Sequence, residues 1–70
     1  MIGTRAVLRR KIQWSLTGEP TRPFEATFGG KRLVVQINDF PADHLYTLIV
    51  EEKPVLSFDD WPDLWLRPAA

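Results

Sequence analysis

Apolar and polar residues alternate along much of the chain, which is the pattern of strands that bury one face. Between residues 6 and 16 the even positions are mostly apolar and include Ile12, Trp14 and Leu16, although Arg10 interrupts the series. A helix would scatter these side chains around its axis, whereas a strand places every second residue on one face. We therefore predict a first strand over residues 6–16, with a basic helix as the alternative.

The clearest local pattern is a pair of glycines between two alternating segments. Residues 24–28 and 32–37 alternate in this way on either side of Gly29-Gly30. Both central residues of a type I′ turn need a positive φ, which glycine adopts without steric cost. The spacing predicts a hairpin in which Phe28 pairs with Lys31, so that the apolar residues of both strands share a face.

Two further β-rich segments, residues 45–51 and 54–58, follow a loop. The first of them is apolar on both faces at Leu48–Val50. A strand of this kind is usually covered on both sides. We therefore expect either that the sheet curls into a barrel or that a partner covers one of its faces.

Together these segments predict one small domain over residues 1–70, of the all-β or β-rich α+β class. Its centre would be an antiparallel meander of about five strands, either closed into a small barrel or left as an open twisted sheet. A short C-terminal helical turn would follow and would carry Trp61 and Trp65 on one face. Because a domain of this size buries only about 60% of its unfolded surface, we expect aromatic-rich packing or association with another chain.

Composition narrows the cellular setting. The chain has no cysteine, which excludes disulfides and thiolate metal sites and fits a reducing compartment. Its apolar stretches are much shorter than the roughly 20 residues that cross a membrane. Basic residues from Arg5 to Lys11 interrupt the N-terminal segment, where a secretory signal would need an apolar core. We therefore expect a cytoplasmic protein without a membrane partner.

The charges are unevenly distributed, although nine Lys+Arg balance nine Asp+Glu. The first 32 residues carry seven basic and two acidic side chains, and the rest of the chain carries two basic and seven acidic ones. We favour an interpretation in which Asp59 and Asp60 face Arg5 and Arg9 across a closing sheet, because a compact fold brings both halves together. The alternative is a bipolar surface that steers a partner or associates head to tail.

The acidic, tryptophan-rich segment 58–66 is the leading candidate contact surface, because tryptophan is common at the centre of protein interfaces. In the competing interpretation both indoles fill an open end of the barrel. We favour this core position for Trp65, and for Trp61 we give the core position and the contact surface equal weight. The carboxylates lack the ordered ligand spacing and the glycine of a calcium loop, so no metal is predicted. The predicted protein-binding residues are Trp61, Trp65, Asp59, Asp60 and Asp63.

Nucleic acid is the alternative partner. Arg5, Arg9 and Lys11 would share the outer face of the first strand, with Arg32 nearby, and a basic face of this kind can bind a single strand. No aromatic residue is interleaved with these cations. A charged edge strand that resists aggregation explains the same residues, so the sequence favours a protein partner or a second copy of the chain.

The sequence contains no convincing catalytic set and no cofactor motif. Its one histidine, His44, follows Asp43 in a loop, and Ser15 and Ser57 fall on predicted strands. A nucleophile, a base and an acid must converge in a pocket, for which a domain of this size has little concavity. We therefore expect a non-enzymatic protein-interaction module, such as a small cytoplasmic adaptor, inhibitor or immunity-type accessory, without a cofactor. The alternative is a small-barrel protein that binds single-stranded nucleic acid.

Overall fold

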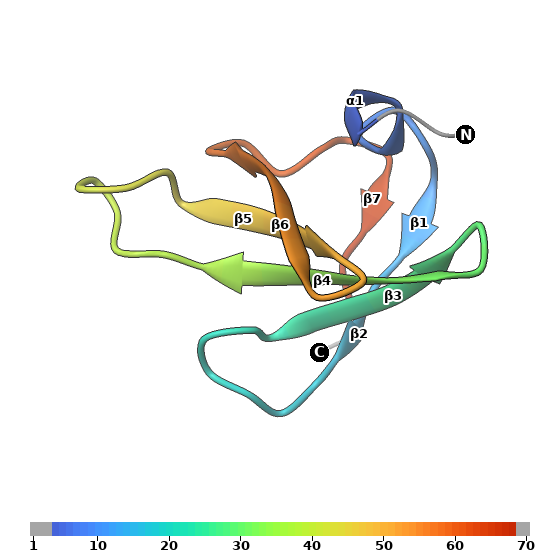
Figure 1. Cartoon of the computed structure of the whole chain (residues 1–70), viewed down its shortest axis with the longest axis horizontal. Helices are drawn as coiled ribbons and strands as arrows, with labels where there is room; N and C mark the ends of the chain where they lie inside the picture. Colours follow the sequence, from blue (N-terminus) through green and yellow to red (C-terminus); the bar gives the residue numbers. More distant parts are fainter. Residues whose placement is uncertain (1–3, 69–70) are drawn as a thin grey trace.

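The computed structural model describes residues 4–68, and the side chains of residues 6–68. Strands β2 to β6 form a five-stranded antiparallel sheet in sequence order, and β1 pairs in parallel with β7 (Figure 1). The predicted antiparallel meander is confirmed, and its sheet is open instead of closed into a barrel. The elements are α1 (Thr4–Val7), β1 (Ile12–Gln13), β2 (Ser15–Leu16), β3 (Phe24–Phe28), β4 (Lys31–Ile37), β5 (Tyr46–Val50), β6 (Lys53–Phe58) and β7 (Trp65–Leu66).

The hairpin of β3 and β4 has the predicted register. Phe28 pairs with Lys31, and the pairing continues along the whole of β3. Gly29 and Gly30 have φ values of 61° and 76°, as the two central residues of a type I′ turn require. The last two predicted strands, β5 and β6, are also present within one residue of their expected ends.

Substituting Gly30 by valine is expected to destabilise the fold by about 1–2 kcal/mol, because a β-branched residue resists the left-handed backbone. A Cβ added at Gly30 meets no atom within 4 Å, so the cost comes from the backbone alone. Asparagine tolerates this conformation, and Gly30→Asn should cost less than half as much. Urea unfolding measures both variants, and equal stabilities for the two would contradict this explanation.

The predicted first strand is wrong in its first half. α1 occupies Thr4–Val7, and a turn follows in which the backbone N–H of Arg10 donates to the carbonyl oxygen of Val7. Val7 is buried whereas Ala6 and Arg10 are exposed, so burial does not follow the even positions before Ile12. The prediction failed because it extended the alternation that begins at Ile12 backwards through the interruption at Arg10.

The second half of that segment is divided between two sheets. β1 pairs with β7, and after Trp14 the chain enters β2, which pairs with β3. The N–H of Trp14 donates to the carbonyl oxygen of Leu66 at 3.0 Å, which continues the β1–β7 pairing to the point of division. Trp14 is therefore the junction between the two sheets.

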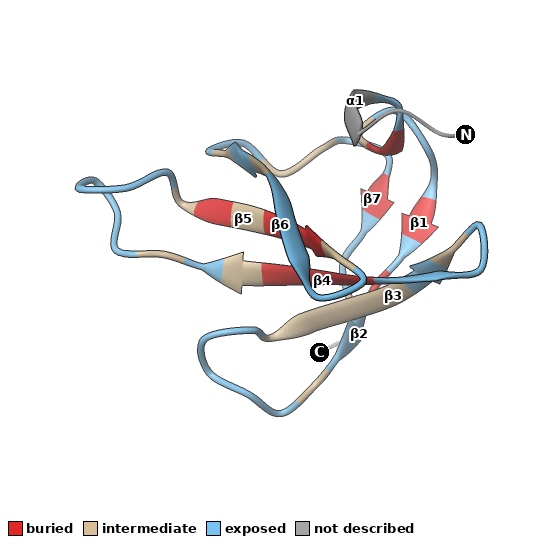
Figure 2. Cartoon of the chain, in the orientation of Figure 1, coloured by how far each residue is buried: buried red, intermediate tan, exposed pale blue. Residues whose placement is uncertain are grey.

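A second layer made of α1, β1 and β7 covers one face of the five-stranded sheet. Figure 2 shows the buried residues concentrated in β4, β5, β1 and β7, while β6 is largely exposed along one edge. Within residues 4–68 no helix is long and apolar enough to cross a membrane. The buried residues of the core are Val7, Ile12, Trp14 and Trp65 from the second layer, and Leu33, Val35, Tyr46 and Leu48 from β4 and β5.

The opposite face of the sheet also has buried apolar residues at its centre. Val34 and Ile49 are partners across β4 and β5 and are 5% and 4% exposed. On this face the long side chains of Arg22 and Arg32 border Val34. The prediction that β5 is covered on both sides is confirmed, but the two expected means of covering it, a closed barrel or a partner, are both wrong. The sheet is open, and its cover is supplied within one copy of the chain.

Candidate protein-docking surface

The segment after β6 carries the chain across the core towards β7. It makes the predicted C-terminal turn, which closes where the N–H of Trp65 donates to the carbonyl oxygen of Pro62 at 3.1 Å. This turn leads directly into β7, a two-residue strand that the sequence did not indicate. The two tryptophans therefore lie in different surroundings, one before the turn and one in a strand.

Trp65 belongs to the core. The residue is 2% exposed, and its Nε1 donates to the carbonyl oxygen of Val7 at 2.9 Å. Its ring centroid lies 4.8 Å from that of Trp14. An indole in this position cannot reach a partner while the chain stays folded. The core position that the sequence analysis favoured for Trp65 is therefore confirmed, and its inclusion among the protein-binding residues is corrected.

Trp61 lies at the boundary between the core and the surface. It is half-buried, and its Nε1 donates to the carbonyl oxygen of Trp65 at 2.9 Å. The ring lies 5.1 Å from Phe24 and 5.7 Å from Tyr46, in the edge-to-face arrangements that aromatic rings prefer. The guanidinium of Arg67 stands 5.0 Å from the centroid, over the ring. These contacts fix the indole while part of it stays accessible.

Two apolar cross-strand pairs lie on either side of Trp61. Leu16 is the direct partner of Phe24 across β2 and β3, and Ile37 is the direct partner of Tyr46 across β4 and β5. Direct partners point to the same face of a sheet, and Trp61 bridges the two pairs. Leu16 is 63% exposed and Ile37 is 38% exposed. We call this group of residues the aromatic strip. It consists of Leu16, Phe24, Trp61 and Ile37, which are at least partly exposed, and of Tyr46, which is buried.

The sequence reasoning missed the outer members of the strip. The signal was nevertheless present for Leu16 and Phe24, which are the apolar ends of two segments on either side of the loop 17–23. A connection between antiparallel strands brings such ends together. Arg67 carried no such signal, because its position over Trp61 depends on the path of the chain after β7.

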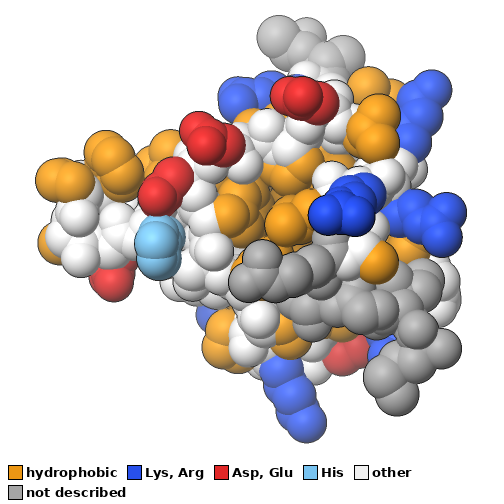
Figure 3. All heavy atoms as spheres, turned by 90° about the horizontal axis from the view of Figure 1, so that it is seen from above, with side chains coloured by type: hydrophobic (Ala, Val, Ile, Leu, Met, Phe, Trp, Pro, Cys, Tyr) orange, Lys and Arg blue, Asp and Glu red, His pale blue; other side chains and the backbone are white. Residues whose placement is uncertain are grey.

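The three acidic residues of the predicted contact segment differ in role. Asp59 fixes the loop between β4 and β5: it accepts the N–H of Leu45 at 2.9 Å, and Nδ1 of His44 lies 3.3 Å from its carboxylate. The backbone hydrogen bond from Leu45, followed by that from His44, lowers the pKa of Asp59 from its ordinary value. Asp60 and Asp63 are exposed. Seen from above, hydrophobic side chains fill the middle of the surface, and most acidic ones lie towards its left half (Figure 3).

Replacing Asp59 by asparagine is expected to remove a pH-dependent part of the stability. Because folding lowers the pKa of this carboxyl, its contribution is complete above the ordinary value of 3.8. The contribution is lost as the pH falls through the lower pKa of the folded state. Thermal unfolding across this acidic range should therefore fall more steeply for the wild type than for Asp59→Asn. The exposed neighbour provides the control, since Asp60→Asn should keep the wild-type slope; equal slopes for all three proteins would refute the assignment.

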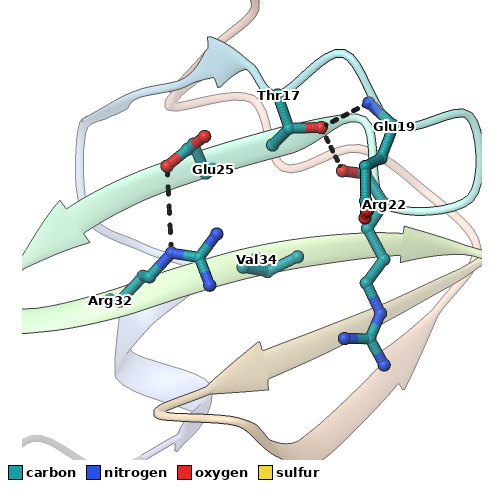
Figure 4. Close-up of a pocket in the computed structure, with 6 residues that line it drawn as sticks. All are labelled: Thr17, Glu19, Arg22, Glu25, Arg32 and Val34. Carbon is teal, nitrogen blue, oxygen red and sulfur yellow. Dashed lines mark hydrogen bonds and ion pairs between the residues drawn. The ribbon is translucent and has the colours of Figure 1, made fainter.

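A shallow cleft of about 370 Å³ lies on the other face of the sheet, beside the loop between β2 and β3. Oγ1 of Thr17 donates to the carbonyl oxygen of Arg22 at 2.6 Å and accepts the N–H of Glu19 at 2.9 Å, which holds this loop in place. Arg22 and Arg32 lie on either side of Val34 (Figure 4). Two basic and two acidic side chains balance in the lining, so the cleft has no marked preference for an anion. The lining residues are Thr17, Glu19, Arg22, Glu25, Arg32 and Val34.

The predicted nucleic-acid residues do not form one basic face. Arg9 and Lys11 are exposed in the connection between α1 and β1, and the side chain of Arg5 lies outside the described residues. Arg32 lies on β4, where carboxylate oxygens of Glu52 and Glu25 are 3.1 and 3.8 Å from its guanidinium and offset its charge. The shared strand face that the prediction required is absent because the chain is not a strand in this region.

The described side chains that could bind a metal ion or take part in catalysis do not gather at one site. In the part of the chain that the structure describes, no group of three or more His, Asp or Glu side chains could hold a metal ion. The imidazole of His44 contacts Asp59, whereas the hydroxyl of Ser57 lies 3.3 Å from that of Thr47. These contacts stabilise a loop and a strand pair, and they do not join the histidine to the serine.

The structure therefore places apolar side chains around Trp61, with the exposed Asp60 and Asp63 in the same segment, and this group is the candidate docking surface. Comparison with known protein families, curated proteins and solved structures finds no match. The functional interpretation consequently depends on the geometry of this chain alone.

Proposed function

We propose that this chain is a non-enzymatic protein-interaction module that binds a partner protein through the aromatic strip. In this proposal it acts as a small cytoplasmic adaptor, inhibitor or immunity-type accessory. The observation that supports the proposal best is the position of Leu16, which is 63% exposed and is the direct partner of the half-buried Phe24. A large exposed apolar side chain beside fixed aromatic rings is typical of the centre of an interface.

The strip also has the rigidity that favours binding. Trp61 is held by a hydrogen bond to the backbone of Trp65 and by contacts with Phe24 and Tyr46. A ring that is already fixed loses little conformational entropy when a partner covers it. A partner that presents apolar side chains to Leu16 and Trp61 would therefore gain the burial of apolar surface with little ordering cost.

Site-specific crosslinking followed by titration tests this function. A photoreactive amino acid at position 16 should crosslink a partner protein in the native cell, whereas the same group at position 55 should not. Val55 is the matched control, because it is also apolar and exposed (40%) but lies on β6. Calorimetric titration with the purified partner should show Leu16→Ser weakening the affinity at least about tenfold, with Val55→Ser unchanged. Equal effects of the two substitutions would refute the assignment to the strip.

A further inference from the structure

One group of basic residues and one group of acidic residues lie at opposite ends of the molecule, whereas Glu51 and Glu52 of the acidic half lie beside Arg32 of the basic half. The loop between β4 and β5 projects at the left end of Figure 1, and the connection between α1 and β1 and the turn between β3 and β4 lie at the right end. Figure 3 keeps this horizontal axis and shows most Lys and Arg side chains towards the right. The longest dimension of the fold is 32 Å, so the two groups of charges are well separated.

This arrangement corrects the expected pairing of Asp59 with Arg9, although the two halves of the sequence do meet where Arg32 pairs with Glu52. Asp59 pairs with His44, not with Arg9. Among the side chains that the structure describes, no ion pair joins the acidic end to the basic end. We call these ends the acidic pole and the basic pole. The acidic pole is Asp39, Asp43, Asp59 and Asp60, and the basic pole is Arg9, Arg10, Lys11 and Lys31, all of them exposed.

The acidic pole contains a groove with an apolar side. The groove has a volume of about 330 Å³ and is open to solvent. Phe40, at the tip of the loop, is 59% exposed. An apolar wall with carboxylates at its rim fits Lys and Arg side chains, which pack their aliphatic stems on apolar surface and keep their charged ends in water. The residues that line the groove are Phe40, Pro41, Ala42, Asp43, His44 and Asp59.

We propose that this groove binds the basic pole of a second copy of the chain, so that copies associate head to tail. The three consecutive cations Arg9, Arg10 and Lys11 supply long stems and positive charge on one exposed segment. The net charge is zero, so two copies approach without overall repulsion while their opposite poles attract. Because the two contacting surfaces differ, each added copy leaves one free pole of each kind, and association increases with concentration.

The distance between the poles explains why a second copy is needed. The long axis of 32 Å is about four Debye lengths at physiological ionic strength, where that length is about 8 Å. The poles of one copy are therefore screened from one another. Contact with a second copy brings opposite charges within a few ångströms and beside the exposed Phe40.

Sedimentation equilibrium tests the proposal on the unmodified protein. At an ionic strength of about 0.01 M, where the Debye length is about 30 Å, the weight-average mass should rise above the 8.1 kDa of one chain as the concentration increases. At about 1 M, where that length is about 3 Å, the mass should return to that of one chain. A constant mass of 8.1 kDa at every concentration in low salt would overturn the proposal.

Charge-reversal variants separate pole-to-pole contact from a general effect of charge. Arg9→Glu/Lys11→Glu and Asp39→Lys/Asp43→Lys should each remain monomeric alone, because the altered pole then has two charges of each sign and no net charge. An equimolar mixture of the two should associate, because each variant keeps the pole that the other has lost. The quadruple variant, in which both poles are neutral and the net charge is still zero, should remain monomeric. A monomeric mixture, or a quadruple variant that associates as the wild type does, with native circular dichroism in each case, would overturn the proposal.

The aromatic strip provides the last control. Leu16 lies on β2, away from both poles, so Leu16→Ser should leave the concentration dependence of the mass unchanged. Loss of association in this variant would place the contact on the strip and would refute the pole-to-pole arrangement. If the protein does not self-associate, the proposal that the strip binds a partner protein is unaffected, because crosslinking and titration test it separately.

Discussion

Replacing Trp14 by alanine is expected to leave most of the chain unfolded at 25 °C. Trp14 is 1% exposed, and its ring centroid lies 4.8 Å from Trp65 and 6.0 Å from Trp61. Removing a buried tryptophan costs about 3–5 kcal/mol, and the core of a domain below about 70–80 residues rarely supplies more than about 3–5 kcal/mol of stability. Loss of near-ultraviolet circular dichroism and of a cooperative urea transition would show the unfolding; a stable, cooperative variant would contradict the central position of Trp14.

Phenylalanine substitutions provide a matched comparison at the two buried tryptophans. Nε1 of Trp14 is buried without a hydrogen-bond partner, so Trp14→Phe removes no hydrogen bond. Trp65→Phe removes a similar volume and also removes the hydrogen bond from the indole to the carbonyl oxygen of Val7, which keeps only the N–H of Arg10 as a donor. We therefore expect Trp65→Phe to lower the free energy of unfolding by about 0.5–1.5 kcal/mol more than Trp14→Phe does. The opposite order in urea unfolding would show that the hydrogen bond does not decide the difference.

Converting the turn between β5 and β6 to Asn-Gly is expected to stabilise the protein by roughly 1–3 kcal/mol. Glu51 and Glu52 have φ values of 50° and 70°, and the flanking Val50 and Lys53 pair directly. Each non-glycine residue in the left-handed region costs about 1–2 kcal/mol, and Asn-Gly is the preferred sequence of a type I′ turn. Glu51→Asn/Glu52→Gly loses the exposed ion pair of Glu52 with Arg32, which contributes at most about 1 kcal/mol.

The control variant for this turn keeps two non-glycine residues in the left-handed region and removes the charges of Glu51 and Glu52. Glu51→Gln/Glu52→Gln should stay within about 1 kcal/mol of the wild type, since only the exposed ion pair is lost. In calorimetry the Asn-Gly variant should melt about 4–8 °C higher for each kcal/mol gained. Equal melting temperatures for the two variants would show that the left-handed backbone carries no cost here.

The parts of the fold that follow from neighbouring residues were predictable from the sequence. The β3–β4 hairpin depends on the Gly29-Gly30 pair and on alternation within a few residues, and its register is as predicted. The β1–β7 pairing was not predictable, because each strand has two residues and the partners Ile12 and Trp65 are 53 positions apart. No periodic pattern develops over two residues, so nothing in the sequence marks such strands.

The same distinction applies to the candidate surfaces. The sequence placed Trp61 in a plausible contact segment, but the separate fate of Trp65 depends on its hydrogen bond to Val7, 58 positions away. The uneven charge was visible in the sequence, whereas its division between two ends of the molecule required the path of the chain. The sequence therefore indicated which side chains are candidates for a contact surface, and the long-range contacts determined which of these side chains face the solvent.

The junction at Trp14 has a consequence for biosynthesis. β1 is completed only by β7, which the ribosome makes after the other six strands. The five-stranded meander can pair progressively as it emerges, but Ile12 and Trp14 lack their contacts with β7 until Trp65 and Leu66 have been added. We expect nascent chains that stop short of these residues to expose apolar surface and to recruit chaperones. The pairing of β1 with β7 should be slow, because it joins segments that are remote in sequence.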